Sequence, residues 1–249
     1  MLSPSRYIDH LRDDAARLID AAMSAPTADV PTCPAWTNAD LLRHVAQLHQ
    51  WCAVNVGHLA PTRETVEFDD PQAPDALAAW AIEQARFLVD VFARTDPDAV
   101  MWTHWGKGPA AYWFRRMAQE TSVHRWDGQL AAGHLGPFDP TFAADGVDEF
   151  LSVYAEARDE HGVMRVAAPP MLLTATDTGD RWLLTADADH FHAEHLGDPL
   201  AAPAVDHEAC ATAQDLLLGV WGRTDLAEVA CRGGDVTEAW LQRLRSAAR

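Results

Sequence analysis

An acidic side chain and a histidine lie one helical turn apart in the stretch ETSVHRWDGQLAAG, residues 120–133. At about 100° per residue, Glu120 and His124 fall inside the apolar stripe of the helix predicted around them, together with Trp113 and Met117. Burial of a lone carboxylate is costly, so a fold tolerates it only when the group is protonated, paired or bound to a metal. The position of Glu120 therefore requires a partner on a neighbouring element.

Histidines of an earlier helix are candidates for that partner. His44 and His49 lie on opposite flanks of the apolar face predicted for residues 38–59, roughly 140° apart, so both cannot reach one ion. Periodicity does not choose between them. Two histidines and one carboxylate from facing helices would form a three-ligand site with positions left for water or substrate. Catalytic zinc sites have this form, and non-haem iron uses the same ligand types.

Ordinary helix pairing is the alternative to metal binding. A glutamate and a histidine at this spacing often form a helix-surface pair, and an inward-pointing histidine is often only hydrogen-bonded. Asp127 follows His124 by three residues and is placed to orient a ligand imidazole. Arg116 and Arg125 are placed to engage Asp127 as an ordinary ion pair. From spacing alone, both interpretations stay open.

Four amphipathic helices must position these residues. Apolar residues recur at intervals of three and four in residues 5–24, 38–59, 75–94 and 109–132. Thr37 and Asp40 form a variant capping box before the second helix, and Gly133 closes the fourth. The pattern predicts an antiparallel four-helix bundle. A Trp- and Gly-rich loop, VMWTHWGKGP, precedes the fourth helix and either closes over one end of the bundle or packs as core.

The sequence pattern changes after Gly162. A linking helix over 140–161 is followed by short β-prone runs (MLLTATD and RWLLTAD), a helix near 211–221, a short strand EVAC and a final helix that begins at Asp235. The predicted fold class is therefore α+β. We expect a four-helix bundle with its linker helix over residues 1–161 and a small α+β domain over residues 162–249.

Composition limits the classes of function. Asp and Glu number 37 against 19 Lys and Arg, a net charge of -18, which disfavours nucleic acid and anionic membranes as partners. No apolar run approaches the roughly 20 residues of a membrane span, and the N-terminus lacks the apolar core of a signal peptide. We expect a cytoplasmic monomer. The four cysteines have no CxxC spacing, and nothing resembles a phosphate-binding glycine loop or a nucleophile elbow.

A second polar tract, DADHFHAEHLGD, is the rival metal site. Its potential ligands are Asp187, Asp189, His190, His192, Glu194, His195 and Asp198. Such a tract can bind metal, but no ligand spacing in it matches a defined motif. A solvated strand edge or loop is therefore the favoured interpretation.

Motifs along the chain give it a family resemblance. TCPAWTNADLLRHVAQLHQW resembles the Cys-Pro-x-Trp-Thr turn and first-histidine helix of the mycothiol-dependent maleylpyruvate isomerase family, which is related to the DinB-like metal-binding bundles. ETSVHRWDGQLAAG is similar to that family's Glu-x-x-x-His-Arg-x-Asp helix. AADGVDEFL and DLLLGVWGR resemble its linker and a segment of its C-terminal domain. The resemblance thus extends from about residue 5 to about residue 245.

This resemblance implies a set of site residues. By it, His44, Glu120 and His124 are the ligands of a zinc or other divalent metal ion, and His49 falls outside the set. The C-terminal domain of the family supplies a catalytic arginine, for which Arg223 is the matching position. The alternative role of Arg223 is a cation favoured by the dipole at a helix C-terminus.

The resemblance also implies a chemistry. It points to mycothiol as the thiol cofactor or co-substrate and to a small electrophilic or unsaturated acid as the substrate. A cation at the sulfur lowers the pKa of the thiol, and the thiolate adds to the substrate for isomerisation or S-transfer. Trp102 and Trp105 are expected to wall the pocket. The alternative from another class is a DinB-like module that binds a small molecule or partner without catalysis.

Overall fold

A computed structural model of the protein describes residues 1–157, 164–197, 204–224 and 230–247. The chain divides into two compact units, Met1–Gly136 and Pro137–Arg249. The first unit is helical and the second contains a sheet with helices. The predicted α+β fold class, with an N-terminal helical bundle and a C-terminal unit rich in strands, is confirmed.

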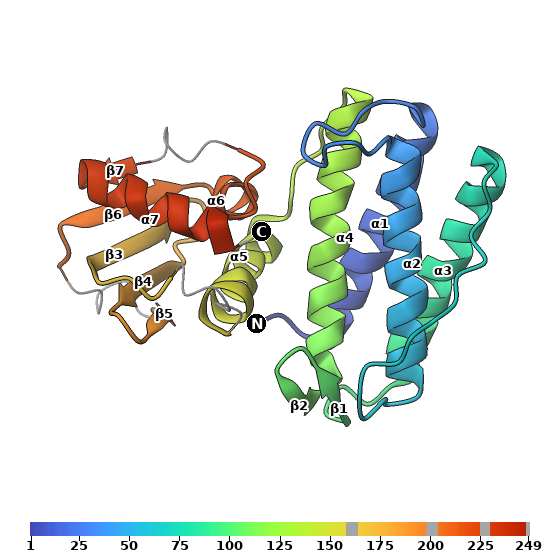
Figure 1. Cartoon of the computed structure of the whole chain (residues 1–249), viewed down its shortest axis with the longest axis horizontal. Helices are drawn as coiled ribbons and strands as arrows, with labels where there is room; N and C mark the ends of the chain where they lie inside the picture. Colours follow the sequence, from blue (N-terminus) through green and yellow to red (C-terminus); the bar gives the residue numbers. More distant parts are fainter. Residues whose placement is uncertain (158–163, 198–203, 225–229, 248–249) are drawn as a thin grey trace. The chain divides into compact units, whose positions relative to one another are not determined.

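Four helices build the first unit: α1 (Pro4–Ser24), α2 (Asn38–Gly57), α3 (Pro74–Arg94) and α4 (Ala111–Ala132). Their ends follow the signals in the sequence. Thr37 caps α2 in a complete capping box with Asp40, and Gly133 adopts a left-handed conformation with φ of 78° at the end of α4. Figure 1 shows the four helices packed side by side as a bundle.

The bundle is formed by two closely packed helix pairs, α1 with α4 and α2 with α3. A Cβ added at Gly128 would come 2.8 Å from Leu18 Cδ1, so the glycine permits the close approach of α1 and α4. Asn38 Nδ2 at the start of α2 donates to the Gly128 carbonyl at 3.2 Å. Residues 58–73 then connect α2 to α3 by running back along the length of the bundle (Figure 1).

A short hairpin precedes α4 where the sequence predicts a Trp- and Gly-rich loop. Its strands are β1 (Val100–Thr103) and β2 (Gly106–Pro109). Trp102 of β1 packs against Trp51 and Trp113 with ring centroids 6.1 and 5.3 Å apart, and its carbonyl accepts a hydrogen bond from Trp113 Nε1 at 2.8 Å. The hairpin is thereby fastened to α2 and α4 by aromatic packing, whereas Trp105 is exposed.

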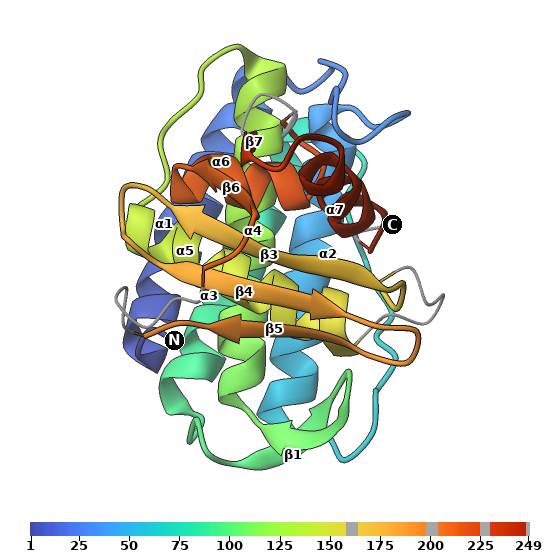
Figure 2. The ribbon, with the colours of Figure 1, turned by 90° about the vertical axis from the view of Figure 1, so that its left-hand side faces the viewer.

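The second unit is a five-stranded sheet with helices. Its strands are β3 (Ala168–Ala175), β4 (Arg181–Ala186), β5 (Phe191–His195), β6 (His207–Ala211) and β7 (Ala230–Arg232), in the order β5-β4-β3-β6-β7 (Figure 2). β3 and β6 are parallel, and the other neighbours are antiparallel. Its helices are α5 (Pro140–Glu149), the π-helical stretch η1 (Phe150–Ala157), α6 (Ala213–Val220) and α7 (Gly234–Ala247).

The predicted linker helix differs from the observed elements. Of the residues predicted as one helix, 140–161, the structure forms an α-helix to Glu149 and a π-helix from Phe150. Residues 158–161 lie outside the described part of the chain. α5 contacts α6, and Phe150 packs edge to face on Trp221 at 5.1 Å. These contacts place the linker in the second unit, whose first residue is Pro137, whereas the predicted boundary follows residue 161.

Two predicted segments of the second unit, the polar tract and the strand EVAC, are observed in part as strands. The polar tract after β4 forms the edge strand β5, in agreement with the favoured interpretation. The predicted strand EVAC is described only from Ala230 onward, as β7. None of the described helices combines the length and apolarity that a membrane span requires.

Candidate metal centre

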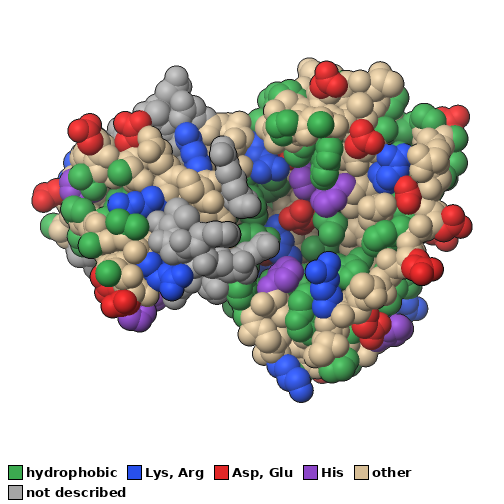
Figure 3. Space-filling view, viewed as in Figure 1, with side chains coloured by type: hydrophobic (Ala, Val, Ile, Leu, Met, Phe, Trp, Pro, Cys, Tyr) green, Lys and Arg blue, Asp and Glu red, His purple; other side chains and the backbone are tan. Residues whose placement is uncertain are grey.

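The side chains of His44 from α2 and of Glu120 and His124 from α4 converge on one another. Each offers a ligand atom, and these atoms all lie within 4.8 Å of one another. His124 Nε2 and Glu120 Oε1 are 3.3 Å apart, and the His44 and His124 rings meet edge to face with centroids 5.4 Å apart. Two ligands at about 2.0–2.1 Å from a tetrahedral ion are roughly 3.3 Å apart, so this spacing fits a shared ion. Histidine and acidic side chains gather over α2 and α4 in Figure 3.

Arg116 fixes the second oxygen of Glu120. Its Nη2 donates to Glu120 Oε2 at 2.6 Å, and the Arg116 side chain is only 2% exposed. Burial opposes ionisation of Glu120, but the charge of Arg116 and the contact with His124 prevail and hold the pKa of Glu120 far below its usual range. Glu120 is therefore a carboxylate at neutral pH, with one oxygen paired and the other facing His124.

Asp127 orients the ring of His124. Its Oδ2 accepts a hydrogen bond from His124 Nδ1 at 2.9 Å, which leaves Nε2 to face Glu120. Burial opposes protonation of His124, but the hydrogen bond to Asp127 and the contacts with Cys33 and Glu120 raise its pKa well above the ordinary value. A cation at Nε2 would replace that proton. A buried carboxylate on the far nitrogen of an imidazole is the usual support of a histidine ligand.

His44 is suited to the neutral state that a metal ligand needs. It is partly buried, and burial followed by the charge of His124 lowers its pKa. The Trp36 ring lies 4.8 Å from the His44 ring between centroids and forms one side of its surroundings. The donor set of one carboxylate and two imidazoles therefore matches a borderline cation such as Zn²⁺.

The turn before α2 completes the surroundings of Asp127. Thr32 Oγ1 donates to Asp127 Oδ1 at 2.6 Å, and Cys33 Sγ lies 3.9 Å from Oδ2. Thr32, Cys33 and Trp36 all belong to the TCPAWT motif, but the motif alone gave them no role. Arg116 was missed as the partner of Glu120, although its position four residues earlier in the helix is the signal for that pair.

His49 lies apart from this cluster. Its Nε2 is 2.8 Å from Thr121 Oγ1, and the side chain is buried. Burial lowers the pKa of His49 to about 4. The two histidines of α2 thus have separate surroundings, as their angular separation on the helix requires.

His49 should make the stability of the protein fall in acid. Its pKa drops from 6.5 to about 4 on folding, so the unfolded chain binds the proton first. Stability that is present above pH 6.5 is then lost as the pH falls toward 4, by about 3 kcal/mol in the free energy of unfolding. Urea unfolding across this range measures the loss. The His49→Gln variant, which keeps a polar group for Thr121, should lack most of it, and an unchanged pH slope in that variant would contradict the assignment.

The rival polar tract has an exposed cluster. Asp187, Asp189 and His190 offer ligand atoms within 4.8 Å of one another, and all three are exposed. Asp187 Oδ1 accepts the backbone N–H groups of Asp189 and His190, each at 2.8 Å, and these bonds lower the pKa of Asp187. The carboxylate therefore stabilises the turn between β4 and β5.

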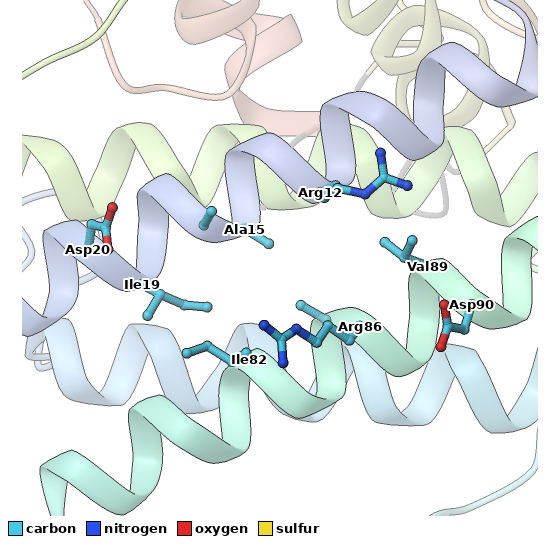
Figure 4. Close-up of a pocket in the computed structure, with 10 residues that line it drawn as sticks. Arg12, Ala15, Ile19, Asp20, Ile82, Arg86, Val89 and Asp90 are labelled. Atoms are coloured by element: carbon cyan, nitrogen blue, oxygen red, sulfur yellow. The ribbon is translucent and has the colours of Figure 1, made fainter.

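A groove lies between α1 and α3, two helices that carry none of the three candidate ligands. Its volume is about 580 Å³, with apolar side chains such as Ile19 and Ile82 along it and Arg12 and Arg86 among its charged residues (Figure 4). It offers no group of metal ligands like that on α2 and α4. The three candidate metal ligands thus lie on α2 and α4 and not along this groove.

Arg223 lies in the second unit, just after α6. Its Nη1 donates to the Trp221 carbonyl at 2.9 Å, and its backbone N–H donates to the Leu218 carbonyl at 2.7 Å. This position agrees with a cation near a helix C-terminus. The catalytic role of Arg223 stays a prediction.

Comparison with known proteins agrees with the bundle and with the motif resemblance. Residues 6–129 match the family model of the mycothiol maleylpyruvate isomerase N-terminal domain, which confirms the resemblance for this part of the chain. A comparison with curated protein sequences gives no match.

Two crystal structures are similar to the chain as a whole. One is the mycothiol-dependent maleylpyruvate isomerase, with a TM-score of 0.60, 16% sequence identity and 92% of each chain covered. The other is a histidine mutant of a mycothiol-dependent maleylpyruvate isomerase, with a TM-score of 0.59, 15% identity and again 92% of each chain covered. At this level of identity the likeness establishes the fold.

Proposed function

From the premise that residues 6–129 belong to the mycothiol maleylpyruvate isomerase N-terminal domain family, we propose that the protein is a divalent-metal enzyme that activates a small thiol. His44, Glu120 and His124 hold the metal, for which Zn²⁺ is the best match. The thiol is mycothiol, and the substrate is a small electrophilic or unsaturated acid. The observation that carries the proposal is the convergence of two imidazoles and one carboxylate within 4.8 Å.

Each residue of the centre has a defined task. When bound, the cation lowers the pKa of a thiol so that a thiolate exists near neutral pH. Glu120 supplies negative charge through the oxygen that Arg116 leaves open. Asp127 holds the ring of His124 in one orientation, and His44 contributes a second neutral imidazole from the facing helix.

The reaction follows from the thiolate. Its sulfur forms a bond to one carbon of a conjugated double bond, and the electron pair moves onto the adjoining carbonyl as an enolate. The former double bond is now single and rotates, after which loss of the thiolate restores a double bond in the trans form. Protonation of the enolate carbon instead keeps the thioether and gives S-transfer. Arg223 is proposed to stabilise the enolate charge.

An assay of thiol addition tests this function. Protein purified without an affinity tag should contain stoichiometric divalent metal by elemental analysis. It should accelerate thiol addition to, or isomerisation of, members of an electrophile panel. Chelation should abolish the acceleration, and added Zn²⁺ should restore it. A metal-containing protein that accelerates neither reaction with any small thiol would instead support the binding module without catalysis.

A further inference from the structure

A small pocket adjoins the candidate metal centre along α2. Its volume is about 240 Å³, and its lining includes His44 and Trp51 from α2 together with Arg63 and Phe68 from the connection 58–73. His44 and Trp51 are seven residues apart, so they lie on the same face of the helix. Because His44 also faces His124, a molecule in this pocket contacts the imidazole of the metal centre.

The wall opposite α2 is held in place at both ends. Near its start, Asn55 accepts the Glu64 N–H at 2.9 Å and donates to the Glu64 carbonyl at 3.3 Å, while Trp51 Nε1 donates to the same carbonyl at 2.9 Å. Near its end, Asp70 forms an ion pair with Arg43 at 2.8 Å. Asn55 is 1% exposed, so its amide is a buried anchor. The pocket is therefore a fixed part of the bundle.

Arg63 brings a positive charge to this pocket. Its guanidinium carbon lies 5.5 Å from the centroid of the Trp51 ring. Within the described ranges of the chain, no carboxylate comes within ion-pair distance of Arg63. Arg43, which precedes His44 in the chain, and Arg116, which contacts Glu120, are both paired with acidic residues. Of these three described arginines, Arg63 is the one whose guanidinium has no acidic partner among the described residues and is open to an anionic ligand.

We propose that Arg63 binds the carboxylate of a small α,β-unsaturated acid whose double bond lies toward His44, an inference that rests on the proposed thiol chemistry. His44 and Trp51 are separated by about 10 Å along α2. A chain of five or six covalent bonds spans about 6–7 Å, and a charge-assisted hydrogen bond adds about 2.8 Å. Arg63 lies over the ring of Trp51, so the spacing of Trp51 and His44 approximates the path from Arg63 to the metal centre. By this estimate, an acid of four to six carbon atoms spans that path.

The shape and chemistry of the pocket agree with such a ligand. Its 240 Å³ lies below the range of roughly 300–1,000 Å³ that drug-sized ligands occupy, which favours a small molecule. Leu48, Val66 and Phe68 supply apolar contacts for the hydrocarbon chain. The arrangement assigns the substrate carboxylate to Arg63 of the first unit.

Calorimetric titration with fumarate tests the inference without turnover. Compared with the wild type, the Arg63→Gln variant should bind fumarate about 10–100-fold more weakly, because it loses a charge-assisted hydrogen bond. Arg63→Lys should recover part of the affinity. Arg86→Gln, which removes an exposed arginine of α3, is the matched control and should bind like the wild type. Equal affinity in Arg63→Gln and wild type, or no fumarate binding by the wild type, would overturn the inference.

A kinetic comparison separates this inference from the proposed function. With an unsaturated acid as electrophile, Arg63→Gln should lower kcat/KM about 10–100-fold, mainly through KM, with metal content unchanged. With the neutral electrophile N-ethylmaleimide, its kcat/KM should stay within about twofold of the wild type. Equal losses for both electrophiles would overturn the role of Arg63. A wild type that binds fumarate through Arg63 but accelerates no thiol addition would defeat the proposed function and leave the carboxylate site standing.

Discussion

The Glu120→Ala variant should purify without stoichiometric metal and bind Zn²⁺ at least about a hundredfold more weakly than the wild type. The substitution removes the only anionic member of the three proposed ligands and leaves the buried charge of Arg116 beside the vacant position. Both changes disfavour a cation. Elemental analysis of untagged protein and competition with a chromophoric chelator measure the effect, and thiol addition should fall to the rate of the free thiol.

Two further variants make this result specific. His44→Ala should lose metal in the same way, and because His44 is partly exposed the bundle should stay folded, as circular dichroism will report. His49→Ala should keep its metal, since that ring is bonded to Thr121. Stoichiometric metal in both Glu120→Ala and His44→Ala would eliminate the proposed site. Metal loss in His49→Ala but not in His44→Ala would identify the other histidine as the ligand.

Replacing Arg125 by leucine should lower the free energy of unfolding by about 3–5 kcal/mol. Arg125 is 1% exposed, and its Nε lies 3.3 Å from Asp14 Oδ1, a carboxylate that is itself buried. Burial raises the pKa of Asp14, an effect that the charge of Arg125 opposes. Arg125 Nη1 also donates to Gln129 Oε1 and to the Gly136 carbonyl, at 2.9 and 2.8 Å. The leucine would leave the buried carboxylate of Asp14 without its buried cationic partner, and it would remove one hydrogen bond each from Gln129 Oε1 and the Gly136 carbonyl.

Urea unfolding measures this loss, and a second substitution tests its cause. The double variant Asp14→Asn/Arg125→Leu should regain part of the stability, because no buried charge is left unpaired. In Arg125→Leu alone, the pKa of Asp14 should rise further, so the penalty should shrink as the pH falls and Asp14 becomes protonated. A loss below about 1 kcal/mol at neutral pH would show that Arg17, 3.7 Å from Asp14, supports the carboxylate by itself.

The helices of the first unit could be predicted from local chemistry. The capping box of Thr37 and Asp40 sets the start of α2, and Gly133 sets the end of α4, because each signal acts on the backbone within one turn. The π-helical stretch after Glu149 has no such local signal. It packs Phe150 and Tyr154 against Trp221, which is distant in sequence, so its geometry depends on tertiary contacts.

Short polar strands and the partners of the metal centre were harder to predict. β5 and β6 are each only five residues long, and β5 lies within a run of charged and histidine residues, so their periodicity does not distinguish a strand from a loop. Helical periodicity places His44 and His49 relative to the axis of α2 but does not fix the rotation of α2 against α4. The choice of His44 therefore came from the family resemblance, and the structure now places that ring, rather than His49, beside Glu120 and His124.

The length of the connection between α2 and α3, residues 58–73, sets the size of the pocket beside His44. Residues 65–69 form one wall of the pocket that Arg63 lines. The wall is anchored on one side by the hydrogen bonds of Asn55 with Glu64 and on the other by the ion pair of Asp70 with Arg43. Insertions or deletions between these anchors would change the width of the pocket while the helices and the ligands they carry keep their places. A change in the length of this connection should therefore alter which small molecules fit the pocket without moving His44, Glu120 or His124.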